Sequence, residues 1–234
     1  MVAPDTLSVT LLATAACVAV AHTALGPDHF LPFVMLSRAR GWSRSRTLAI
    51  TAACGVGHVG SSLVIALAGV ALGAGMGALE EARGQLAAWA MVAFGVAYGL
   101  WGLRRTVRAR RGIALHEHHG HVHVHGGGGG HHHHVHGTSE RGTTFWALFV
   151  VFVLGPCEPL LPLFLVPASQ GRWALAGAVA IVFSAATLAT MLLLVGLAQT
   201  GLARLSWGRL EAYTHPLAGA TIAASGLAVL FLGL

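Results

Sequence analysis

The chain has 234 residues, of which 55% are hydrophobic and 9% are charged; an ordinary soluble domain is about 25% charged, so this composition excludes a soluble enzyme or a disordered chain and predicts a polytopic membrane protein. All 14 basic residues are arginines and the formal net charge is +6, an excess that in a membrane protein is typical of cytoplasmic loops and not of nucleic-acid binding. Three cysteines without paired spacing give no disulfide framework, whereas 15 histidines, 11 of them between His116 and His136, are an unusual number.

Six stretches nearly free of charged residues are long enough to cross a membrane, since a spanning helix needs about 20 apolar residues. In chain order they are 6–36, interrupted at Asp28 and His29; 47–79; 84–103; 142–167, interrupted at Glu158; 173–203; and 212–234. We therefore predict an all-α polytopic membrane protein with six transmembrane helices. The first stretch lacks the basic region and cleavage signal of a secretory peptide, so we expect it to be retained.

Arginine counts orient these predicted spans, because cytoplasmic loops carry an excess of positive charge. The first, third and fifth loops hold four, six and two arginines, whereas the second and fourth loops hold one each. In the second loop we place Arg83, beside Glu80 and Glu81. We expect both termini outside, the odd-numbered loops in the cytoplasm, and the chain in the cytoplasmic (inner) membrane.

A repeated motif divides the chain into two halves. Residues 26–32 read GPDHFLP and residues 155–162 read GPCEPLLP, at an offset of 129. Gly-Pro interrupts a helix. Three spans in each half would give the halves opposite orientations, and transporters built as inverted repeats bind substrate near the midplane, at broken helices. We predict a 3+3 inverted repeat: a three-span half at 1–103, a flexible histidine-rich cytoplasmic loop at 104–143, and a second three-span half at 144–234.

Ionisable side chains inside the spans are functional candidates, because a charge at mid-bilayer costs about 2.5–3.5 kcal/mol even on mild scales. The candidate metal ligands of a transport site are His22, Asp28, His29, His58, Cys157 and Glu158. On an unbroken helix His22 and His29 would stand about 10 Å apart, so a break at Gly26-Pro27 is needed before they can share one ion. Imidazole and carboxylate ligands suit Ni(II), Co(II), Zn(II) or Fe(II); for any one histidine alone, a helix–helix hydrogen bond is the alternative.

The segment between the two halves is rich in histidine and glycine and cannot build a core. Imidazole is a common metal ligand and a histidine-rich tract is typical of metal binding, so we predict that this loop captures metal. An engineered tag is the alternative, but the tract is internal and irregular. Its histidines are His116, His118, His119, His121, His123, His125, His131, His132, His133, His134 and His136.

The sequence HTALGPDHF at 22–30 resembles the nickel/cobalt transporter superfamily, especially its six-span NicO-type and urease-accessory-like membrane members. Further matching residues are Gly57-His58 and GPCEP at 155–159, and the histidine-rich central loop fits exporters of that family. The resemblance implies that His22, Asp28, His29 and His58 bind the translocated metal. The chain departs from the long-established nickel permeases, which use His-x4-Asp-His and eight spans; here the spacing is His-x5-Asp-His, and the metal and direction of transport stay open.

The leading expectation is a transporter, not an enzyme, that moves Ni2+ or Co2+ by alternating access, with Zn2+ and Fe2+ as further candidates. Efflux is favoured because the predicted collecting loop lies in the cytoplasm. We expect the metal ion and the lipid bilayer as partners, no nucleic acid and no prosthetic cofactor, and leave the oligomeric state open.

Three alternatives remain. A membrane thiol-disulfide oxidoreductase needs a second thiol, but the repeat partner of Cys157 is Asp28. An intramembrane metal-dependent enzyme would hold zinc by three histidines and keep one position open, although no His-Glu-x-x-His motif is present. Export of an anion or amino acid is disfavoured, because no arginine is centred in a predicted span.

Overall fold

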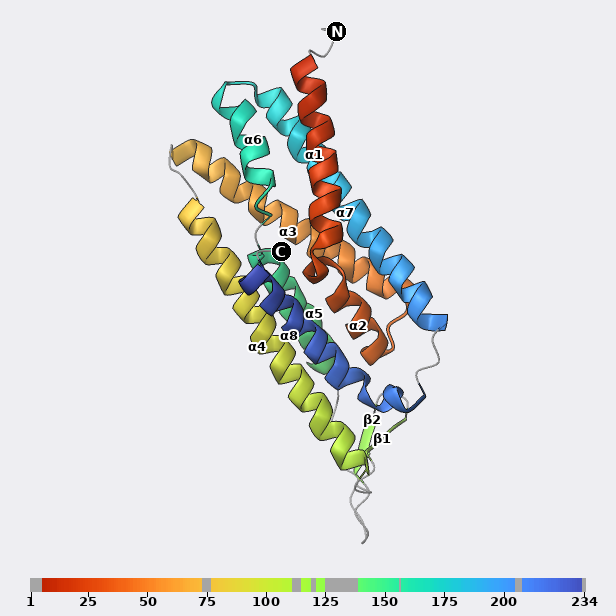
Figure 1. The fold of residues 1–234 in the computed structure, drawn as a ribbon. Coiled ribbons are helices and arrows are strands. Elements are labelled where there is room, and N and C mark those ends of the chain that lie inside the picture. The colour runs from red at the N-terminus through yellow and green to blue at the C-terminus, as the bar shows by residue number, and fades with distance from the viewer. Residues whose placement is uncertain are drawn as a thin grey trace.

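The computed structural model describes residues 6–72, 77–110, 115–118, 121–124, 139–155, 157–204 and 208–232, which are helical apart from one two-stranded hairpin (Figure 1). The helices in chain order are α1 (Thr6–Leu25), the 3-10 helix η1 (Pro27–His29), α2 (Leu31–Arg40), α3 (Arg44–Leu72), α4 (Gly77–Arg110), α5 (Ser139–Leu154), α6 (Leu160–Ser169), α7 (Trp173–Arg204), the 3-10 helix η2 (Gly208–Tyr213) and α8 (Thr214–Leu232). The prediction of an all-α fold is confirmed for the described residues apart from the hairpin.

Five helices in the described part of the chain are long and apolar enough to cross a membrane: α1, α3, α4, α7 and the segment Glu211–Leu232 that contains α8. A sixth spanning helix is not confirmed. The predicted fourth span, 142–167, is divided between α5 and α6, and neither has an apolar stretch long enough to cross alone. The interruption falls at residues 155–159, where Gly155 and Pro159 lie, because proline cannot donate the backbone hydrogen bond of a continuing helix.

The predicted first span is interrupted in the same manner. The chain leaves α1 at Leu25, and Gly26 takes an extended conformation (φ −81°, ψ 102°) before Pro27 opens η1. The short helices α2 and α6, which follow the two interruptions, have ten residues each. Each is followed by a glycine of positive φ, Gly41 (61°) and Gly171 (72°), a conformation that suits glycine because it lacks a Cβ atom.

Two long-range helix pairs dominate the packing. In Figure 1, α4 runs beside α8 and α1 runs beside α7. Small residues allow α4 and α8 to meet backbone to backbone: a Cβ atom on Gly219 would overlap the backbone of Gly99, and one on Gly95 would overlap the backbone of Ala223. Such small-residue contacts are a common means of helix association in membranes.

The buried apolar residues form two clusters, and α3 and α7 contribute to both. One cluster includes Cys54 of α3 and Met191 of α7, packed with Phe33 and Phe152. The other includes Cys157 and Phe183, together with Ala66 of α3. On α3, the polar position His58 therefore lies between the residues of one cluster and those of the other.

The segment predicted as a flexible loop, 104–143, is more structured at its ends than expected. Helix α4 continues through Arg110, because arginine has good helix propensity, and α5 begins at Ser139. Between them lies the hairpin of β1 (Leu115–His118) and β2 (His121–Val124), whose register pairs His116 with His123 and His118 with His121. The predicted capture residues His119, His125, His131, His132, His133, His134 and His136 lie outside the described residues.

Candidate metal centre

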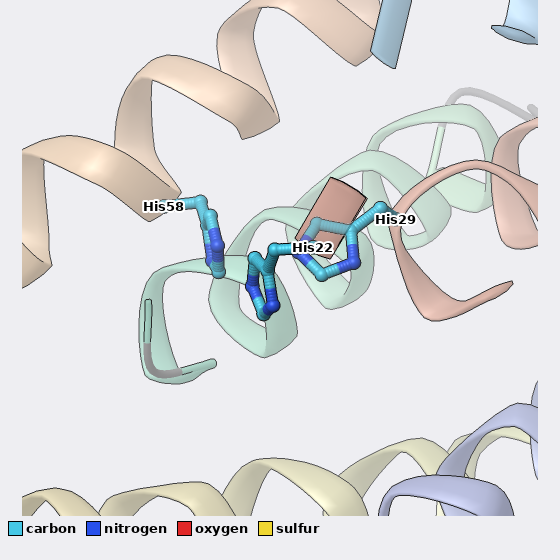
Figure 2. A group of neighbouring side chains, drawn as sticks. All are labelled: His22, His29 and His58. Atoms are coloured by element: carbon cyan, nitrogen blue, oxygen red, sulfur yellow. The ribbon is translucent and has the colours of Figure 1, made fainter. Parts of the chain in front are cut away.

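Three of the predicted ligands converge at one place in the fold. His22 comes from α1, His29 from η1 and His58 from α3, and one ring nitrogen of each lies within 4.8 Å of the other two. Figure 2 shows the three imidazoles gathered in a common space. Among the residues that the structure describes, they form the one group of three or more histidine, cysteine or acidic side chains close enough to share an ion.

The break after α1 makes this convergence possible. The ring centroids of His22 and His29 are 4.8 Å apart in an edge-to-face arrangement, about half the separation that an unbroken helix would give. The ring of His58 then lies 5.2 Å from that of His29. The interruption at Gly26-Pro27 therefore folds two histidines of one segment against each other.

Two of the imidazoles are held by hydrogen bonds through Nδ1. In His29, Nδ1 lies 3.0 Å from Asp28 Oδ1, and in His58 it lies 3.2 Å from the backbone carbonyl oxygen of Phe152. A carboxylate and a carbonyl can only accept, so Nδ1–H donates in both cases and the lone pair of each neutral ring is on Nε2. Metal-binding histidines are commonly fixed in this way by a partner on the other ring nitrogen.

The opposite ring nitrogens have no partner. Nε2 of His22, of His29 and of His58 is buried in each case and makes no hydrogen bond. Buried polar atoms are nearly always hydrogen-bonded, and three exceptions at one place indicate a position for a ligand. Since metal–nitrogen bonds are about 2.0–2.1 Å for an ion such as zinc, a shared ion would require the three nitrogens to lie closer together than 4.8 Å.

Asp28 has a different position from the three histidines. Its carboxylate is bound to His29 and does not belong to the group of converging ligand atoms. It also lines the cavity in front of the histidines. Its place in the geometry is therefore to orient His29 and to supply negative charge beside an incoming cation.

The second motif is separated from the histidine cluster. Cys157 is fully buried in the apolar cluster with Phe164 and Phe183, and its backbone N–H donates to Ser62 Oγ at 3.0 Å. Glu158 is exposed and lines the same cavity as the histidines. Neither residue is among the converging ligand atoms. The chain turns at the interruption after Gly155, which directs Cys157 toward α7 and leaves Glu158 facing the cavity.

A cavity of about 530 Å³ lies against the histidines. Three carboxylates, those of Asp28, Glu81 and Glu158, line it together with the three imidazoles. The rest of its lining is largely apolar and comes mainly from α4, α5 and α8: Gly84, Gln85, Ala87, Ala88, Trp89, Met91, Val151, Phe152, Gly155, Pro159, Val229, Leu230 and Phe231. A negatively lined cavity that ends at imidazole nitrogens is suited to a cation that prefers nitrogen ligands.

Arg83, which the arginine pattern predicts in the second loop, lies instead on α4, is 9% exposed and reaches the end of α5. Its guanidinium donates to Ser61 Oγ at 2.7 Å and to the carbonyl oxygens of Gly155 and Val153 at 2.8 and 2.9 Å. The sequence offered no signal for this position, because an arginine beside two acids between two apolar stretches resembles an ordinary loop residue.

No family model, curated protein or solved structure matches this chain. The resemblance of HTALGPDHF to the nickel/cobalt transporters therefore stays a prediction. The functional argument rests on the residues of the site and on their geometry.

Gly26→Ala is expected to weaken metal binding about ten- to a hundredfold, the range found when a partner of a metal-binding histidine is lost. A Cβ atom at this position would lie 2.6 Å from His29 Nδ1 and 2.8 Å from Asp28 Oδ1, so both side chains would have to shift. Titration of the purified protein with Co2+ measures the effect. Gly177→Ala is the matched control, because a Cβ atom there meets nothing within 4 Å. Equal affinities in the two variants would contradict the prediction.

Proposed function

We propose that this chain is a membrane transporter of divalent transition-metal ions, with Ni2+ or Co2+ ahead of Zn2+ and Fe2+, and that His22, His29 and His58 bind the ion. One observation carries the proposal: three histidines, each with a buried Nε2 that has no hydrogen-bond partner, bring one ring nitrogen each within 4.8 Å of the others and line a cavity together with Asp28. Neutral imidazoles bind such ions well. Asp28 offsets part of the positive charge of the ion without joining the three nitrogens.

The site favours reversible binding over permanent retention. Three imidazole nitrogens spaced within 4.8 Å of one another form an open set, unlike the closed tetrahedral shell of a structural zinc site. An ion carried across a membrane must bind and then leave. Because the donor groups must be deprotonated to bind, we expect affinity to fall as the pH becomes acidic.

Two features support an inverted 3+3 repeat, which is the architecture that we propose for transport. The helices of one half pack against those of the other half in a symmetric way. Helix α1 contacts α7, and its repeat equivalent α5 contacts α3, the equivalent of α7. The equivalent helices α3 and α7 contact each other, as do α4 and α8. The ten-residue helices α2 and α6 each follow an interrupted span and each precede a glycine of positive φ. In such repeats the substrate binds at the broken helices, and the halves move relative to each other to give alternating access.

The arginine-rich end of α4 favours a cytoplasmic location for the histidine-rich segment that follows it. The cavity is lined by residues from the opposite part of α4, between Glu81 and Met91, and by the last turns of α8. Helix α4 has 34 residues and is therefore about 50 Å long, so the hairpin lies far from the cavity. With both termini outside in the inner membrane, the cavity faces outward, which is the state from which an exporter releases its ion. We propose efflux on this basis.

The thiol-disulfide alternative receives no support from the cysteine positions. Cys17 is exposed, whereas Cys54 and Cys157 are buried in different apolar clusters. The alternative of an intramembrane metal enzyme shares the three-histidine site with the transporter, so the two must be separated by experiment.

Metal flux in proteoliposomes tests the proposal. The purified protein is reconstituted and assayed for uptake and release of Ni, Co, Zn, Fe, Mn and Cu ions, with protein-free vesicles as the baseline. Selective flux of one or two of these ions is the expected result and identifies the substrate. A folded protein that binds metal but moves none of the six ions would overturn the transporter and favour the enzyme.

Deleting residues 116–136 is expected to raise the metal concentration needed for half-maximal flux without lowering the maximal rate. The deletion removes 11 histidines that we propose as a collector, but leaves α4, α5 and the three-histidine site intact. Flux measured over a range of Ni2+ and Co2+ concentrations separates the two parameters. Complete loss of flux in a folded deletion variant would place the loop within the translocation path and contradict a collecting role.

Neutralising both exposed cavity carboxylates, by Glu81→Gln with Glu158→Gln, is expected to raise the half-saturating metal concentration several-fold. The two acids line the cavity that leads to the histidines, and charge of this kind raises the local concentration of cations at low ionic strength. Flux should be measured at two salt concentrations, because added salt is expected to reduce the difference. Glu211→Gln is the control, since Glu211 pairs with Arg38 on the surface. No change in the double variant at low salt would contradict this role.

A further inference from the structure

Four oxygen atoms surround a single nitrogen of Arg83. Its Nη2 lies 2.7 Å from Ser61 Oγ, 2.8 Å from the Gly155 carbonyl oxygen, 2.9 Å from the Val153 carbonyl oxygen and 3.4 Å from Ser62 Oγ. A guanidinium –NH₂ group has only two protons to donate, so oxygen acceptors outnumber donors here. Carbonyl and hydroxyl oxygens gathered in this way are the ligands that proteins use for hard cations.

The site lies at the end of a helix that stops inside the protein. Helix α5 ends at Leu154, and the last carbonyl groups of a helix have no partner within it and carry a partial negative charge. In a membrane these groups must be satisfied by other parts of the protein. Arg83 donates to the carbonyl oxygen of Val153 in the last turn and to that of Gly155 just after the helix, and His58 donates to that of Phe152 at 3.2 Å.

The same guanidinium joins three elements around the interruption. Its nitrogens Nη1 and Nη2 both lie 3.4 Å from Ser62 Oγ, and that oxygen also accepts the backbone N–H of Cys157 on the far side of the interruption. Arg83 itself lies on α4, and Ser62 lies on α3. Its position therefore fixes the end of α5 against α3 one turn from His58, whose free Nε2 faces the metal position.

We propose that Arg83 is a positioning residue that acts as a tethered cation: its guanidinium fills an oxygen site at the end of α5 and, through the Phe152 carbonyl, holds His58 in the orientation for metal binding. The two interruptions then differ in kind. The first presents imidazoles to an exchangeable ion, and the second holds a cation that is covalently part of the chain. This inference rests on the proposed function for its metal readout, but the cation site is tested separately.

Arg83→Ala with added guanidinium is the decisive experiment. The variant leaves an oxygen-lined space, and guanidinium well below denaturing concentrations is expected to raise its melting temperature, because a ligand that binds the native state stabilises it. Wild type, whose site is filled, and Arg38→Ala, which removes a surface arginine, are expected to show no such rise. Co2+ affinity of Arg83→Ala should fall about tenfold, as when a partner of a metal-binding histidine is lost, and guanidinium should restore it together with the wild-type ligand-field spectrum of the bound Co2+.

Each outcome decides the inference. A folded Arg83→Ala variant with wild-type Co2+ affinity and spectrum overturns the inference. So does a variant whose melting temperature does not rise with added guanidinium. If the alanine variant does not fold, Arg83→Lys and Arg83→Gln replace it: the lysine variant, which keeps a cation, should retain the Co2+ spectrum, and the glutamine variant should lose it. Identical spectra and affinities in these two variants would overturn the inference. If wild type binds no Co2+, the proposed function fails, while the guanidinium effect on Arg83→Ala still decides whether the cation site exists.

Discussion

Replacing His58 by alanine is expected to abolish metal-selective flux in proteoliposomes. The substitution removes one of only three converging ring nitrogens, and the remaining two, from His22 and His29, cannot on their own form the three-coordinate set. The imidazole of His58 is fixed by the Phe152 carbonyl, and among the described residues no further histidine, cysteine or acidic side chain belongs to the group. Flux of the ion identified with wild type, at matched protein density in the vesicles, measures the effect.

The control for this variant is His215→Ala. His215 lies at the start of α8, where its Nδ1 is hydrogen-bonded to the Tyr98 hydroxyl at 2.8 Å and its ring packs edge-to-face on Trp101. It does not line the cavity, so its loss is expected to leave the choice of metal unchanged. Wild-type flux in a folded His58→Ala variant would show that the three-histidine site is not needed for transport.

Asp28→Asn is expected to abolish flux while leaving expression and folding intact. Asparagine keeps an oxygen that can accept the hydrogen bond of His29 Nδ1 at the place where the carboxylate now lies 3.0 Å away. What the variant loses is the negative charge beside the cluster, which offsets the charge of a bound cation where the surroundings are largely buried. The same charge raises the basicity of His29 toward a metal.

Comparing the asparagine variant with Asp28→Ala separates orientation from charge. If both abolish Co2+ binding, the charge is essential; if only alanine does, orientation of His29 is the greater contribution. Glu211→Gln, which also removes one negative charge but from the protein surface, controls for net charge. Unchanged flux in Asp28→Asn would exclude Asp28 from the site.

The parts of the structure that depend on local sequence could be predicted. A Gly-Pro pair in an apolar stretch favours an interruption of the helix, so the break at Gly26-Pro27 and the approach of His22 to His29 could be expected from the chain itself. The place of His58 in the same cluster could be expected because polar residues inside spans are few. The histidine cluster was thus within reach of sequence reasoning.

The parts that depend on packing between distant segments could not be predicted. Cys157 adjoins Glu158 in the sequence, but only the fold decides that the thiol enters the apolar cluster with Phe183 while the carboxylate faces the cavity. Arg83 lies next to two acids and therefore resembles a loop residue. Its partners, at Ser61 and at the end of α5, are brought near only by the packing of α3, α4 and α5. The division of the predicted fourth span is different, because the Gly-Pro motif at 155–156 already indicated an interruption there.

The contact between α4 and α8 limits how the cavity can change shape. Gly95 and Gly219 bring the two backbones so close that a Cβ atom at either position would overlap the opposite helix. We expect the two helices, one from each half of the chain, to shift together. They form the wall of the cavity that faces the histidines, which belong to α1, η1 and α3. Displacement of this wall would admit or exclude water and ions while the three imidazoles keep their mutual geometry.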